Sequence, residues 1–106
     1  MNLTERLGKC YTGAVYDVLK SKGHSSCVLP ATIRPLNIDQ KLAGRVFTVS
    51  GHRDDHADPH QTLLKWTELL SKAPADSVIV CQPNDHELAL MGELSAETLQ
   101  LRKVRG

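Results

Sequence analysis

The residues best suited to chemistry stand together at Gly92-Glu93-Leu94-Ser95, where the pattern predicts the start of a helix. The first turn of a helix has backbone N–H groups without intrahelical partners, and its dipole favours negative charge. The free N–H groups of such a turn could bind an anion, with the Glu93 carboxylate beside them. The alternative is that Glu93 only favours the helix dipole, a contribution of about 0.3–1 kcal/mol.

Asn84 and Asp85 form a second candidate, because they directly follow the apolar run Ser77 to Gln82. That run predicts a buried strand, and open α/β sheets bind ligands at the carboxyl ends of their strands. Asn and Asp also favour ordinary turns, since they tolerate left-handed backbone geometry. The sequence leaves both interpretations open.

Three histidines, His52, His56 and His60, recur at every fourth position among aspartates and suggest a zinc site. This spacing places ligands on one face only if the whole segment is helical. Asp58-Pro59 predicts instead that a helix starts between His56 and His60, with Asp58 as its N-cap. We therefore favour a solvated loop, rather than a zinc site, for residues 51–57.

The elements that position these residues alternate between strands and helices, which predicts an α/β fold in one domain over residues 1–106. The expected strands lie at 42–50 and 77–82, with a weaker extended piece at 32–34. Apolar spacing predicts three helices: one through Tyr11, Ala14, Val15, Val18 and Leu19 that ends at Gly23, one after Pro59, and one over about 93–103 that buries Leu94, Thr98 and Leu101. Arg102, Lys103 and Arg105 should complement the dipole of this last helix.

The composition excludes several classes of protein. Thirteen basic and twelve acidic residues give a charge of +1, with no basic cluster for nucleic-acid binding. No run approaches the ~20 apolar residues of a membrane span, and the start of the chain lacks a signal-peptide core. The three cysteines lack C-x-x-C spacing, which favours a reducing compartment. We expect a soluble, cytoplasmic protein.

Three segments, in order along the chain, resemble the RraA-like family of ribonuclease regulators and 4-hydroxy-4-methyl-2-oxoglutarate aldolases. Thr12 to Leu19 is similar to the family's T-A-x-V-x-D-A-L helix, and Ala43 to Val49 to its A-G-x-A-x-T-V strand. Gly92-Glu93-Leu94, followed by Ala96, resembles its G-[DE]-L-L-A motif. The resemblance implies a swivelling β/β/α domain that assembles as a trimer.

The resemblance also implies a reaction, the Mg²⁺- or Mn²⁺-dependent cleavage of a 4-hydroxy-2-oxo acid that releases pyruvate, or oxaloacetate decarboxylation. It gives Glu93 the role of orienting metal-bound water. Gly92, Leu94 and Ser95 would hold the substrate carboxylate. Asn84 and Asp85 are further candidates for substrate contacts, because of their place at the end of the buried strand rather than from the resemblance. In the family, an Arg-Asp pair that grips substrate and metal follows the first acid by twenty residues. That position lies beyond Gly106, so we expect a C-terminally incomplete domain with an impaired site.

Two alternatives to an active enzyme remain. RraA-like regulators act by binding a ribonuclease, which needs no turnover and tolerates an incomplete site. The other alternative is a shortened chain without activity of its own. Metal-dependent pyruvate release would favour the aldolase, and tight metal-independent binding to an RNA-degrading enzyme would favour the regulator. Self-association is physically reasonable in either case, because a small sheet leaves open edges.

Overall fold

A computed structural model describes all 106 residues, and the chain divides into two compact units, Met1–Ala43 and Gly44–Gly106. The first unit contains two helices, α1 (Leu3–Gly8) and α2 (Thr12–Ser21). The side chain of Asn2 caps α1 by accepting from the N–H of Glu5, whose carboxylate accepts from the N–H of Asn2 in return. The helix predicted around Val15 is α2, and Gly23, with φ of 87°, follows its end. The extended piece expected at 32–34 forms no strand.

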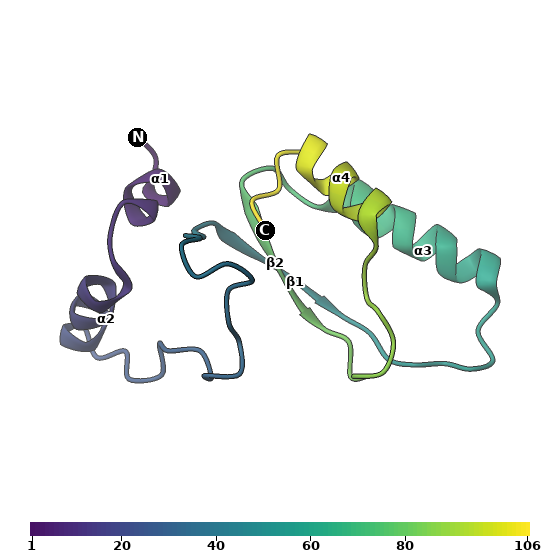
Figure 1. Cartoon of the computed structure of the whole chain (residues 1–106), viewed down its shortest axis with the longest axis horizontal. Helices are drawn as coiled ribbons and strands as arrows, with labels where there is room; N and C mark the ends of the chain where they lie inside the picture. Colours follow the sequence, from purple (N-terminus) through teal and green to yellow (C-terminus); the bar gives the residue numbers. More distant parts are fainter. The chain divides into compact units, whose positions relative to one another are not determined.

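The second unit is built on a parallel pair of strands, β1 (Arg45–Ser50) and β2 (Ser77–Gln82), as Figure 1 shows. Their register pairs Arg45 with Ser77 and continues to Ser50 with Gln82. Parallel neighbours need a crossover, and α3 (Pro59–Lys72) provides it. The Asp58 side chain caps α3 by accepting from the N–H of Gln61 at 3.1 Å. The predicted α/β class and the predicted start of α3 are confirmed.

The core of this unit lies between the sheet and two packed helices, α3 and α4 (Glu93–Leu101). Leu70, Ala73 and Leu99 are its buried residues, and Phe47 and Ile79 pack against them from the sheet. On the other face of the sheet, Val46 and Val80 are exposed. β2 has the predicted bounds, but in this unit the helices cover one face of the sheet, so the strand predicted to be buried is open on its other face.

The predicted buried face of α4 is also wrong. Leu94 and Leu101 are 80% and 85% exposed, and Thr98 is exposed as well, whereas Leu99 is only 6% exposed. The apolar residues of this helix fit two faces at a period of 3.6. Tertiary contacts select between them, because α3 lies on the side of Ser95 and Leu99, and the Trp66 side chain donates to Ser95.

The basic residues after α4 do not serve their own helix as predicted. The Arg102 guanidinium donates to the carbonyl oxygens of Ser71 at 2.6 Å and Ala73 at 3.4 Å, so it caps the end of α3 instead. Arg105 forms an ion pair with Asp76. The backbone of residues 103–106 then lies along β2, bonded to Asp76, Ser77 and Ile79 at 2.8 Å. No helix of the chain has the length and apolar content required to cross a bilayer.

Candidate functional site

The first turn of α4 places Glu93 and two backbone donors at an open helix end. Gly92 is the N-cap, in an extended conformation, and no heavy atom lies near the position that a Cβ there would occupy. Glu93, Leu94 and Gly92 are exposed, and the Glu93 carboxylate takes part in no hydrogen bond or ion pair. No side chain caps the helix, and the N–H groups of Leu94 and Ser95 have no acceptor in the chain. This turn can accept an anion.

Ser95 differs from its neighbours in the same turn because its side chain is already bonded. Its Oγ accepts a hydrogen bond of 2.8 Å from the indole Nε1 of Trp66 on α3. Its hydroxyl proton and its backbone N–H both remain free to donate to a ligand. The bond fixes the first turn of α4 against the middle of α3.

Asn84 and Asp85 lie at the carboxyl end of β2, as predicted, but both side chains hold the loop together. The Asn84 amide donates to the carbonyl of Gly51 at 2.7 Å, and Asn84 has a φ of 56°. The Asp85 carboxylate accepts from the N–H of Leu88 at 2.8 Å. No hydrogen bond joins either residue to Glu93.

A cavity of about 390 Å³ lies at the carboxyl ends of β1 and β2 and includes Asp85 in its wall. Its other walls come from the loop after β1, from one face of α3 and from the loop before α4. The residues that matter most for its chemistry are Arg53, Lys65, Trp66, Leu69 and Leu88. None of these five residues was predicted as a site residue from the sequence. Arg53 could have been found from its place just after a strand, and Lys65, Trp66 and Leu69 from their spacing along one face of α3.

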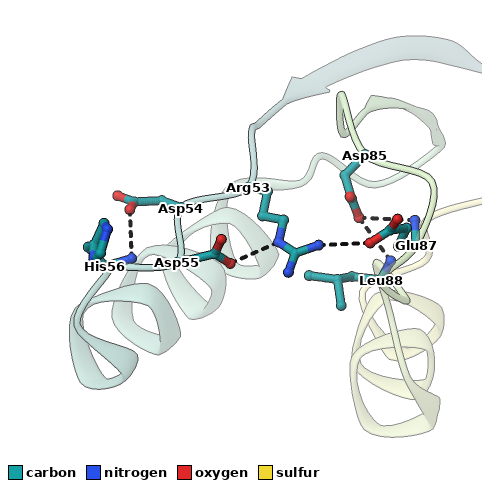
Figure 2. Close-up of polar contacts among 7 residues, drawn as sticks. All are labelled: Arg53, Asp54, Asp55, His56, Asp85, Glu87 and Leu88. Atoms are coloured by element: carbon teal, nitrogen blue, oxygen red, sulfur yellow. Dashed lines mark hydrogen bonds and ion pairs between the residues drawn. The ribbon is translucent and has the colours of Figure 1, made fainter.

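Arg53 connects the two loops beside the cavity, as Figure 2 shows. Its Nε donates to Asp55 at 2.8 Å, and its Nη1 donates to Glu87, thirty-four residues away, at 2.9 Å. The hydrogen bond to Asp55, and then that to Glu87, raise the pKa of the Arg53 guanidinium above its ordinary value. Its charge is therefore satisfied within the protein.

The histidines and aspartates of the 51–58 loop do not gather around a common point. Nowhere do three or more His, Cys, Asp or Glu side chains lie together in a way that could hold a metal ion. His52 and His56 precede α3, and His60 lies inside its first turn, so the helix start falls between them. Glu93 likewise belongs to no such group.

One of three comparisons with known proteins finds a match. Neither the curated proteins nor the solved structures include a match to this chain. A family model described as RraA-like, Aldolase/RraA, matches residues 12–106, which include α2, both strands and the α4 turn. The chain belongs to the RraA-like family.

Proposed function

We propose that this chain takes part in a pyruvate-releasing aldolase reaction on a 4-hydroxy-2-oxo acid such as 4-hydroxy-4-methyl-2-oxoglutarate, and in the related decarboxylation of oxaloacetate. The observation that carries the proposal is the first turn of α4, where the Glu93 carboxylate and the N–H groups of Leu94 and Ser95 are all without partners in the chain. Membership of a family of aldolases and regulators supports it.

The chemistry requires a site that binds a carboxylate and tolerates developing negative charge. Cleavage of the bond between C3 and C4 leaves its electron pair on a pyruvate enolate, which then takes up a proton. In the proposal, the N–H groups of Leu94 and Ser95 hold the substrate carboxylate at the positive end of the α4 dipole. Glu93 accepts a hydrogen bond from a water molecule that receives the proton of the 4-hydroxyl group.

A divalent ion, Mg²⁺ or Mn²⁺, belongs to the proposal as the Lewis acid that stabilises the enolate charge. Glu93 fits a contact through water, because Mg²⁺ takes few protein carboxylates and keeps several waters. It is the single carboxylate of this turn. The proposal also includes a homo-oligomer, a trimer by family. A cytoplasmic location suits its three free cysteines.

The test measures pyruvate release from 4-hydroxy-4-methyl-2-oxoglutarate and from oxaloacetate with Mg²⁺, with Mn²⁺ and with chelator. We expect metal-dependent release that falls at least ~100-fold in Glu93→Gln, in line with the loss of a positioned proton-transfer group. Glu97→Gln is the matched control, because Glu97 is exposed one turn further along the same helix. A folded protein without metal-dependent release, or equal activity of Glu93→Gln and Glu97→Gln, would contradict the proposal.

A second function, inhibition of a ribonuclease by direct binding, is favoured by a different observation. Leu94 and Leu101 leave an apolar face of α4 open to solvent, and exposed apolar residues of this kind mark protein-binding surfaces when they form a patch. In this case a purified RNA-degrading enzyme from the same cells would lose activity when the chain is added without metal. Leu101→Asp would relieve that inhibition, whereas Glu93→Gln would not.

A further inference from the structure

The cavity at the strand ends has the size and lining of a small-molecule site, and the proposed reaction does not use most of it. Its volume of about 390 Å³ falls within the range of roughly 300–1,000 Å³ that ligand pockets occupy. All its walls come from residues 49–90, so it belongs to the second unit alone. Its position at the carboxyl ends of parallel strands is the usual place for ligands in open α/β sheets.

Lys65 is the cavity's cation without a carboxylate partner. The other fixed positive charge in the wall, Arg53, is paired with both Asp55 and Glu87 (Figure 2). On α3, Glu68 is paired with Lys72 at 2.6 Å rather than with Lys65. An anion that entered the cavity would therefore meet one ammonium group free to pair with it, and the ion pair would not displace any existing partner.

The rest of the wall favours an apolar, flat ligand body. The Trp66 side chain is half-buried, and its Nε1 is already bonded to Ser95, so the ring is held in place by α3 and α4. Leu69 is half-buried beside it on α3, and Leu88 and Leu90 come from the opposite loop. A fixed indole and leucine side chains suit an aromatic ring, which can stack or pack edge to face.

We propose that this cavity binds a small aromatic carboxylate, with the carboxylate paired to Lys65 and the ring packed between Trp66 and Leu88. A single free cation suits a monoanion. No helix N-terminus lies in the wall, because α3 contributes to it only from Thr62 onward and α4 contributes nothing. A phosphate group, which needs several donors, is therefore less well served than a carboxylate. The site stands independently of aldolase chemistry.

The experiment titrates the protein with 4-phenylbutyrate and follows the fluorescence of Trp66, the one tryptophan of the chain. We expect a saturable change in intensity or wavelength as the ring approaches the indole. 4-Phenylbutanamide is the matched neutral ligand, and it should bind about fivefold more weakly, because one partly exposed ion pair is lost. The measurement detects binding without turnover, so its result does not depend on whether the chain is an active aldolase.

Variants of Lys65 then test whether its ammonium group pairs with the carboxylate of the ligand. Lys65→Gln should weaken 4-phenylbutyrate about fivefold and leave the amide unchanged, and Lys65→Arg should restore most of the affinity. Lys72→Gln is the control, because Lys72 lies two turns further along α3, outside this cavity and paired with Glu68. An absence of saturable change, equal affinity for acid and amide, or an equal effect of Lys65→Gln and Lys72→Gln would overturn the proposal.

Discussion

The indole Nε1 of Trp66 donates a hydrogen bond to the Oγ of Ser95 at 2.8 Å, which ties the middle of α3 to the first turn of α4. Ser95 lies two residues after Glu93, so this bond helps to set the direction in which the free N–H groups of that turn point. The same indole forms part of the wall of the strand-end cavity. One side chain therefore supports both the proposed aldolase turn and the proposed carboxylate site.

We expect Trp66→Phe and Ser95→Ala each to lower the free energy of unfolding by about 1–3 kcal/mol, because both remove this hydrogen bond. Trp66→Phe should cost more, since it also removes buried ring area. Urea unfolding of the two single variants and the double variant measures the coupling free energy between Trp66 and Ser95. The double variant should be more stable than the sum of the single losses predicts, by about 1 kcal/mol. Strict additivity would show that the bond contributes nothing to stability.

Gly44 stands where another strand approaches too closely for a side chain. A Cβ at this position would lie 2.7 Å from Val78 Cγ2 and 3.0 Å from the carbonyl oxygen of Asp76. We expect Gly44→Ala to lower the free energy of unfolding by about 1–3 kcal/mol, the usual cost of overpacking. Gly51→Ala is the control, because nothing lies near its added Cβ and its backbone is not left-handed. Equal stability of the two variants in thermal unfolding would contradict this account.

Local signals decided how much of the fold could be predicted. Asp58-Pro59 fixed the start of α3, and the apolar run from Ser77 gave the bounds of β2, since both depend on residues adjacent in sequence. The short helix α1 was not predicted, although Asn2 and Glu5 form a capping box that could have indicated it. The buried face of α4 and the partner of Arg102 could not be predicted, because both depend on where α3 lies in space.

In the candidate site, too, features set by adjacent residues could be predicted and features set by tertiary contacts could not. Glu93 could be placed at a helix start from the sequence, and it is the first residue of α4. The hydrogen bond that the Ser95 hydroxyl accepts could not be foreseen, because Trp66 is twenty-nine residues away. The pairing of Arg53 with Glu87 likewise joins loops thirty-four residues apart. Spacing along the chain identifies residue types that can do chemistry, and the tertiary contacts determine which of them remain free.

The choice of buried face on α4 can be tested with two leucines of the same helix. Leu99→Ala should lower the free energy of unfolding by about 2–5 kcal/mol, because Leu99 is buried against Leu70 and Ala73. Leu101→Ala should change it by no more than about 0.5 kcal/mol, as expected for an exposed residue. Denaturant unfolding of the two variants gives both values. A larger loss for Leu101→Ala in the isolated chain would mean that the helix packs on its other face.

Cys81 on β2 provides a prediction of pH dependence. Burial raises the pKa of its thiol above the ordinary value, since the thiolate would be poorly solvated there. The folded state therefore holds the proton more tightly than the unfolded state does. The resulting contribution to stability is complete below the pKa of the unfolded chain and is lost as the pH rises through the higher pKa of the folded chain. We expect stability to fall on the alkaline side, and Cys81→Ala to reduce that fall.

The same shift should slow the reaction of Cys81 with iodoacetamide, because the thiolate is the reactive form. In the folded chain, alkylation followed by mass spectrometry should modify the exposed Cys10 before Cys81 at neutral pH. Raising the pH should narrow the difference between the alkylation rates of Cys10 and Cys81. Unfolding in urea should abolish that difference, because both thiols are then solvated. Equal rates in the folded chain would show that Cys81 is not shielded and that the wall of the cavity around it is open to solvent.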